Sequence, residues 1–152
     1  MELTVNSDEY FMREALRQAE IAYDEGEIPV GAIVVCQKKI IAKAYNQTEK
    51  LNDVTAHAEM LAITAAANHL GGKYLTDCTL YVSLEPCGMC AGALNWSQIS
   101  EIVYALEDEK RGFTKINPHM VHSKTKVRSG LMASESKKIL DNFFARLRDR
   151  RN

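Results

Sequence analysis

The stretch between residues 55 and 90 constrains this chain more than any other, because it carries a histidine, an acid and two cysteines in a fixed order. It begins T-A-H-A-E and ends E-P-C-G-M-C. His57, Cys87 and Cys90 offer one imidazole and two thiols, the donor set of a zinc site that keeps its fourth position open for water. A purely structural zinc site would close the tetrahedron with a fourth Cys or His. Glu59 is not required as a ligand and is free to act as a base.

The spacing predicts that these side chains lie at two helix ends. Cys87 and Cys90 stand at i and i+3 directly after Pro86, and proline is common just inside the start of a helix. We therefore expect the cysteines on one face of a first helical turn, where free backbone N–H groups favour the thiolate that binds metal. His57 and Glu59 open an apolar run, and at a helix tip both can reach a site beyond the end. The sequence predicts two helix N-termini that meet at one zinc ion.

Taken singly, the motifs have other interpretations. A C-x-x-C after a strand is also typical of a thioredoxin-like redox pair, and a single histidine is usually an ordinary surface or core residue. The joint pattern, H-x-E followed by P-C-x-x-C, favours a metal site, because it is a recognised signature of the zinc nucleobase deaminases.

Further segments carry a closer resemblance. They are G-E-I-P-V-G-A at 26–32, Asn46, D-V-T-A-H-A-E at 53–59, L-E-P-C-G-M-C-A-G-A at 84–93, and the tail pair Phe143 and Phe144 with Arg146 and Arg148. On these residues nearly the whole chain resembles the bacterial-type tRNA-specific adenosine deaminases, members of the cytidine deaminase superfamily. The zinc motif alone indicates only the superfamily, whereas the A-G-A after the second cysteine and the F-F tail favour the tRNA branch. Two departures stand out: Val54 replaces the usual proline, and residues 109–117 lack the expected G-A-x-G-S run.

The resemblance implies a homodimeric, cytoplasmic enzyme with one zinc ion per chain, which converts adenosine to inosine at the wobble position of a tRNA anticodon. Glu59 would then be the catalytic proton shuttle, and Asn46 would hydrogen-bond the edge of the base. Four apolar residues would form the wall of the substrate pocket, namely Ile28, Pro29, Val30 and Leu84. The backbone N–H of Ala58 would hold the base. Ordinary core packing is the alternative for the apolar four, and a turn residue is the alternative for Asn46.

RNA contacts beyond the base require a local basic patch, since the net charge of the chain is only −1. The available groups are Lys110 and Arg111 after the fourth strand, and Phe144, Arg146 and Arg148 near the C-terminus. Phe143 is expected inside and Phe144 at the edge of the buried stripe, where its ring could stack on a loop base. The alternative is a solvated helix end whose cations suit the negative pole of the helix dipole.

Composition and length indicate one domain over residues 1–152, with 26% charged and 46% hydrophobic residues. The start M-E-L-T-V-N-S-D-E has no signal-peptide pattern, and no apolar run approaches the ~20 residues of a membrane span. Cys36 and Cys78 are expected as reduced core residues. Trp96 is expected in the core or in a dimer interface.

Alternating helical and strand patterns predict a three-layer α/β/α sandwich with a mixed five-stranded sheet, of the cytidine deaminase type by resemblance. Helices are expected at 8–25 with Ser7 as its cap, at 55–70, at 87–96, and after Ala133 with Ser134 as its cap. Strands are expected at 30–36, 40–45, 79–84, 101–105 and 126–131. The long connection at 106–125 allows the last two strands to run parallel.

Two other functions remain open at this stage. A deaminase of free guanine, cytosine or a nucleoside would use the same zinc site without the basic tail. A redox protein or a zinc-binding module would have no hydrolytic activity, and one zinc ion per chain would distinguish the enzymes from the redox protein.

Overall fold

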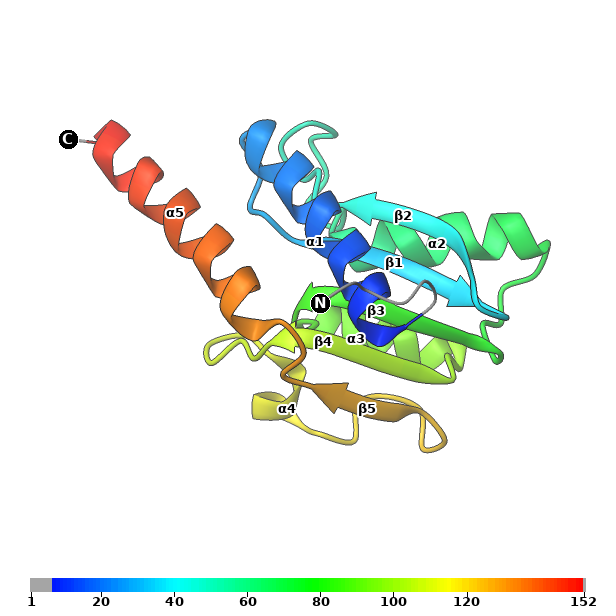
Figure 1. Cartoon of the computed structure of the whole chain (residues 1–152). Helices are drawn as coiled ribbons and strands as arrows, with labels where there is room; N and C mark the ends of the chain where they lie inside the picture. Colours follow the sequence, from blue (N-terminus) through cyan, green and yellow to red (C-terminus); the bar gives the residue numbers. More distant parts are fainter. Residues whose placement is uncertain (1–6, 152) are drawn as a thin grey trace.

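The computed structural model describes residues 7–151, and it arranges them in three layers around a five-stranded sheet (Figure 1). The strands are β1 (Gly31–Cys36), β2 (Lys39–Tyr45), β3 (Cys78–Leu84), β4 (Glu101–Leu106) and β5 (Lys126–Ser129). The helices are α1 (Asp8–Asp24), α2 (Ala58–Leu70), α3 (Gly88–Ser97), α4 (Phe113–Ile116) and α5 (Ala133–Arg151). The predicted α/β/α sandwich is confirmed.

The strand order is β2-β1-β3-β4-β5, antiparallel from β2 to β3 and parallel from β3 to β5. The parallel pairing of β4 and β5 confirms the crossover that the long connection allows, since a tight turn cannot join parallel strands. That connection contains the one-turn helix α4, which the sequence patterns did not indicate.

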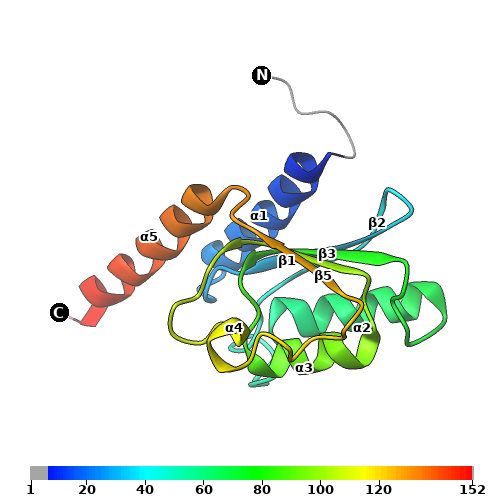
Figure 2. The same ribbon diagram turned by 90° about the horizontal axis from the view of Figure 1, so that it is seen from below.

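Each face of the sheet has its own core, because successive side chains of a strand point to opposite faces. On β1, Ala32 and Val34 pack with α2 and α3, whereas Ile33 and Val35 pack with α1. Figure 2 shows α1 and α5 on one face and α2 and α3 on the other. Helix α1 approaches so closely that a Cβ on Gly31 would lie 2.0 Å from the backbone oxygen of Ala15, so only glycine fits there.

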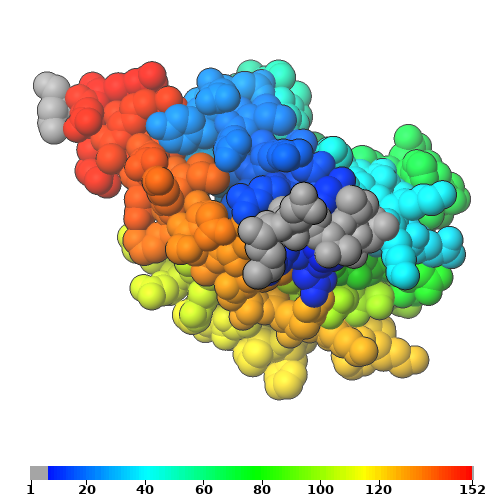
Figure 3. Space-filling model, in the orientation of Figure 1, coloured from blue at the N-terminus to red at the C-terminus, as the bar shows by residue number. Residues whose placement is uncertain are grey.

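Helix α5 lies beside α1 and then extends past the sheet (Figure 1), and its C-terminal end forms one edge of the face shown in Figure 3. Its start differs from the prediction. Ser134 does not cap the helix; its hydroxyl donates to Glu135 within the first turn. Strand β5 ends two residues early, because Gly130 and Met132 turn the chain with φ of 98° and 60°. Ser7 does cap α1, accepting from the Tyr10 N–H at 3.1 Å.

Burial departs from what residue type suggests at three places, and two of these correct the predicted core positions of Cys36 and Trp96. Helix α2 is apolar but buries one face only, through Ala58, Glu59, Ala62 and Ala66, because a helix in an outer layer meets the sheet on one side. Cys78 is buried, whereas its cross-strand partner Cys36 is only partly buried. Trp96 is 81% exposed, so it is not a core residue.

Within residues 7–151, no helix combines the length and the apolar character that crossing a membrane requires. Residues 1–6, which include most of the segment that lacks a signal-peptide pattern, lie outside the described part of the chain.

Candidate active site

His57 stands at the N-terminal tip of α2 as its N-cap residue. The helix begins at Ala58 and not at residue 55, because hydrogen bonds hold the preceding residues in turns. Thr55 donates to the Asp53 carboxylate from its backbone N–H at 2.8 Å and from its hydroxyl at 2.7 Å, and His57 N–H bonds the Thr55 carbonyl at 2.8 Å. The extended backbone of His57 then leaves the imidazole free of any capping hydrogen bond.

Cys87 is likewise an N-cap residue, at the start of α3, and Cys90 lies in the first turn of that helix. Pro86 therefore precedes the cap and is not the first helical residue, which is Gly88, two positions later. Two helix N-termini do meet, as the spacing predicted, and their free N–H groups favour negative charge between them.

The three predicted ligands are brought together. Their donor atoms all lie within 4.8 Å of one another, and His57 Nδ1 lies 3.6 Å from Cys87 Sγ and 3.5 Å from Cys90 Sγ. Tetrahedral zinc with Zn–S of about 2.3 Å and Zn–N of about 2.0–2.1 Å would separate sulfur and nitrogen by about 3.6 Å. The side chains therefore fit a zinc ion, with one position left for another ligand.

Of the two thiols, that of Cys87 is readily deprotonated. A hydrogen bond from Cys90, assisted by one from His57, lowers the pKa of Cys87 to about 4. The hydrogen bond to Cys87 in turn raises the pKa of Cys90, and the contact with Cys87 also raises the pKa of His57. Without a cation, the Cys90 proton is held between the two sulfurs. A cation placed there would favour loss of this proton, because it would stabilise both thiolates.

Glu59 lies in the first turn of α2, with only 4% of its surface exposed. Burial raises its pKa to about 7, and the negative charge of Cys87 contributes in the same direction. A carboxyl group with a pKa near neutral can both accept and release a proton. Glu59 interacts with the Cys90 side chain and is absent from the cluster of donor atoms that could hold a metal ion, which matches the predicted separation of base and ligands.

Asn46 directly follows β2 and is buried, with 6% of its surface exposed. Its Nδ2 donates to the Ile28 carbonyl at 3.3 Å, and its backbone N–H bonds the Val30 carbonyl at 3.0 Å. Within residues 7–151, nothing donates a hydrogen bond to the buried Oδ1 atom. An unpaired buried acceptor is costly, so a ligand that donates to it would be favoured.

The other predicted pocket residues come from the same end of the sheet. The register that pairs Ala32 with Val82 places Val30 opposite Leu84, two positions beyond the last pair that the strands form. Pro29 is buried, Val30 and Leu84 are partly buried, and Ile28 is 44% exposed. Ala58 is the first residue of α2, so its N–H has no partner within the helix.

A family model described as the cytidine and deoxycytidylate deaminase zinc-binding region matches residues 5–106. The chain belongs to this deaminase family. It is 41% identical to the tRNA-specific adenosine deaminase of Rickettsia bellii, over 91% of this chain and 100% of the relative, and 43% identical to that of Aquifex aeolicus, over 93% and 96%.

Solved structures agree with this assignment. A structure from a study of A-to-I editing by tRNA:A34 deaminases at the wobble position is 41% identical, with a TM-score of 0.81 over 86% of this chain and 99% of that one. Guanine deaminase from Bacillus subtilis is 37% identical, with a TM-score of 0.65 over 77% of this chain and 73% of its own.

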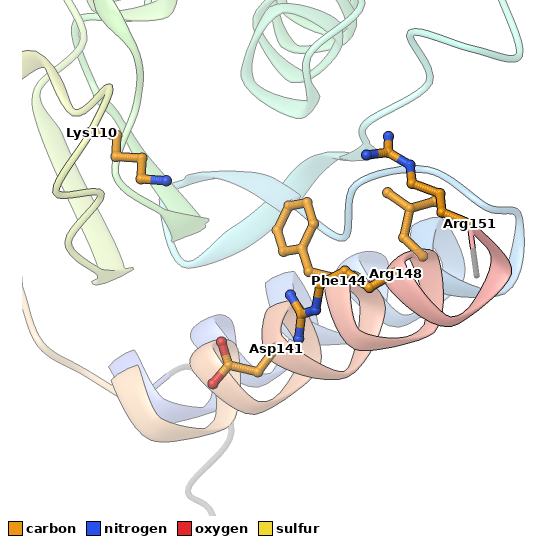
Figure 4. Close-up of a pocket in the computed structure, with 6 residues that line it drawn as sticks. Lys110, Asp141, Phe144, Arg148 and Arg151 are labelled. Carbon is orange, nitrogen blue, oxygen red and sulfur yellow. The ribbon is translucent and has the colours of Figure 1, made fainter.

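This deaminase also carries a basic groove of about 440 Å³ on α5 (Figure 4). Three of the residues predicted to contact RNA line it together, namely Lys110, Phe144 and Arg148. Phe144 is 38% exposed, whereas Phe143 is buried, as predicted. In Figure 4 the Phe144 ring rises from α5 toward Lys110, which reaches in from the loop after β4. Leu147, Arg151 and Asp141 complete the lining.

The other two predicted RNA contacts lie outside the lining of this groove. Arg111 is exposed on the loop after β4. The Arg146 guanidinium lies over the Tyr23 ring, 4.2 Å from its centroid, and donates to the Tyr23 carbonyl at 3.1 Å. Arg146 therefore connects α5 to α1.

Two buried acids that the sequence analysis passed over support the loops around the site. Glu27, 1% exposed, accepts the N–H groups of Glu49 and Lys50 at 3.0 and 2.8 Å. Glu85, 2% exposed, holds the loop after β4. Each is the single acidic residue of a motif that otherwise holds apolar or small residues and cysteines, at 26–32 and 84–93. That isolated acid was the available signal of a buried carboxylate.

Proposed function

We propose that this protein is a zinc-dependent tRNA adenosine deaminase, which hydrolyses adenosine to inosine at the wobble position of a tRNA anticodon. The observation that carries the proposal is the meeting of His57, Cys87 and Cys90 beside the buried acid Glu59. The extensive similarity to tRNA-specific adenosine deaminases supports this substrate.

We assign one zinc ion per chain to His57, Cys87 and Cys90. When bound, zinc supplies a Lewis acid that makes hydroxide available from water at neutral pH. Glu59 accepts one proton of the attacking water and delivers it to the ring nitrogen. It then takes the second proton from the new hydroxyl group and delivers it to the departing amine, so that the carbonyl forms, the C–N bond breaks and ammonia leaves. The buried position of Glu59 suits this task, because a pKa near 7 lets one carboxyl group perform both transfers.

The base is oriented by polar groups at the edge of the pocket. Asn46 Oδ1, buried and unpartnered, would accept a hydrogen bond from the base, and the Ala58 N–H would donate to it. Ile28, Pro29, Val30 and Leu84 supply apolar walls, which is the usual lining of a small-molecule pocket.

The tRNA is held outside the pocket by the groove on α5. Loop bases can be splayed out and flipped, and they are recognised by stacking and by phosphate contacts. Lys110, Arg111 and Arg148 offer the cations, and Phe144 offers the ring, for a stacking contribution of about 1–3 kcal/mol per base. Arg146 contributes to this surface by fixing α5 in place.

We also propose a homodimer. Trp96 on α3 is 81% exposed and Met89 of the same helix is 39% exposed, and exposed aromatic and Met side chains are enriched at subunit interfaces. A cytoplasmic location agrees with the proposed tRNA substrate and with the free thiols of Cys36, Cys78, Cys87 and Cys90.

A guanine deaminase is the second candidate, favoured by the similarity to the enzyme from Bacillus subtilis. The test is to incubate the purified protein with tRNA, guanine, cytosine and adenosine, and to search each by mass spectrometry for the gain of about 1 Da that replacement of an amine by a carbonyl produces. Glu59→Gln protein serves as the control. Inosine in tRNA supports the proposal, whereas conversion of a free base with none in tRNA would reject it in favour of the second candidate.

A further inference from the structure

Glu85 is a buried anion with no catalytic role in the mechanism above. It lies between β3 and the metal ligand Cys87, and only 2% of its surface is exposed. Among the described residues, no Lys, Arg or His lies within ion-pair distance of its carboxylate. A buried charge is costly unless other groups compensate it, so its hydrogen bonds indicate its role.

Both carboxylate oxygens of Glu85 bind the segment at 108–114. Oε1 accepts the N–H of Asp108 at 3.1 Å. Oε2 accepts the N–H of Thr114 at 3.0 Å and the hydroxyl of Thr114 at 2.7 Å. One side chain thus fixes the two ends of this loop.

The loop is also joined directly to the residues that carry the metal ligands. Gly112 forms an isolated β-bridge with Cys87, and Phe113 N–H bonds the Pro86 carbonyl at 2.9 Å. A Cβ on Gly112 would lie 2.3 Å from the carboxyl carbon of Glu85. Because the φ of Gly112 is −59°, an ordinary one for any residue, the proximity of Glu85 is what requires glycine here.

The hydrogen bonds continue from the loop to its basic residues. The Asp108 carboxylate accepts the backbone N–H groups of Lys110 and Arg111 at 3.0 and 3.1 Å. Lys110 lines the groove on α5. A continuous path of contacts therefore runs from Cys87, through Glu85 and Asp108, to the cations proposed to hold RNA.

We propose that Glu85 is a positioning residue, which fixes the RNA-contacting loop at 108–114 relative to the metal centre and so sets how tightly tRNA is held for reaction. This inference rests on the proposed function. A carboxylate is needed because the loop presents three donors from two directions. Glutamine at 85 has a single acceptor oxygen, and its NH₂ group would face one of these donors.

The experiment compares Glu85→Gln with the parent enzyme and with a matched control, Glu14→Gln. Glu14 is also a buried acid, 8% exposed, but it pairs with Arg17 and Lys43 on α1 and β2. For each protein, KM and kcat are measured with tRNA, together with zinc per chain and the thermal midpoint.

We expect Glu85→Gln to raise the KM for tRNA about tenfold, the factor for losing a hydrogen bond to a charged group, while kcat changes less and zinc is retained. Glu14→Gln should keep the parent's KM. Should Glu85→Gln fold poorly, Thr114→Val tests the same contact by removing the hydroxyl, and Thr114→Ser, which keeps it, should restore the parent's KM.

A Glu85→Gln enzyme that deaminates tRNA with the parent's KM overturns the inference and leaves the proposed function standing. Loss of zinc from Glu85→Gln also overturns it, because Glu85 would then support the ligands and not the loop. Equal KM values for Thr114→Val and Thr114→Ser would count against it in the same way.

Discussion

Arg146 stacks on Tyr23, with its guanidinium carbon 4.2 Å from the ring centroid, and its Nη2 donates to the Tyr23 carbonyl. The contact joins the last helix to the first. Two arginines that are two residues apart on the same helix therefore have different roles, since Arg148 is exposed and lines the basic groove.

The first prediction separates these arginines. Arg146→Ala should lower the free energy of unfolding by about 1–2 kcal/mol, through loss of a cation–π contact and a charged hydrogen bond. Arg148→Ala should leave the thermal midpoint unchanged and reduce the slope of log K against log salt for tRNA by roughly 0.7–0.9. Thermal melts and binding titrations at several salt concentrations measure the two effects. If Arg148→Ala binds tRNA like the parent at every salt concentration, the tail is an ordinary solvated helix end.

The second prediction concerns Glu59. Glu59→Gln should keep the zinc ion and the fold while lowering kcat by about 100- to 10,000-fold, the usual contribution of a positioned acid–base group. Metal analysis and single-turnover kinetics measure both. Loss of zinc together with activity would show that Glu59 is a ligand.

The third prediction concerns the thiols. Cys87→Ala or Cys90→Ala should release zinc, because two donors remain where His57 and both sulfurs now converge. Metal analysis after gel filtration provides the measurement, with Cys36→Ala as the control for loss of a thiol elsewhere. Stoichiometric zinc in either mutant would contradict the assigned coordination.

The fourth prediction concerns Asn46. Asn46→Ala should reduce kcat/KM by about tenfold, because the base loses a hydrogen-bonding partner. Stability should change little, since the substitution removes an unpaired buried acceptor along with the bond to Ile28. Denaturation curves and kinetics distinguish this from the alternative: a large loss of stability with unchanged kcat/KM would make Asn46 a turn residue only.

The fifth prediction concerns pH. A hydrogen bond from Arg128 holds the pKa of Asp8 below its ordinary value of 3.8. A depressed pKa in the folded state means that the pair stabilises the protein above the ordinary value, and that this stability is lost as pH falls through the folded pKa. Asp8→Asn should therefore melt below the parent at neutral pH, and the difference should shrink in acid.

Glu9→Gln is the control for this pH series, because Glu9 also lies in the first turn of α1 but is exposed and forms no described ion pair. A difference between Asp8→Asn and the parent that is constant across the acid range would contradict the assignment.

Much of this architecture was predictable from local patterns. The alternation of helical and strand patterns gave the element order, and the length of the connection after β4 allowed the parallel pairing of the last strands. The ligands His57, Cys87 and Cys90 and the base Glu59 were recognisable, because metal chemistry demands particular residue types at particular spacings. The two helices that carry the ligands start later than predicted, α2 by three residues and α3 by one, since an extended N-cap residue lies before each tip.

The sequence by itself determined the donor set, the base and the layered sandwich, because these depend on residue chemistry and on short-range periodicity. Only the tertiary structure decided that Arg146 packs on Tyr23 while Arg148 lines the groove, and that Glu85 anchors a loop more than twenty residues away, at Asp108 and Thr114. The type of a charged residue does not indicate whether its side chain faces solvent or a buried backbone amide. Which of these it meets depends on contacts between distant segments, and those exist only once the sheet and its helices have packed.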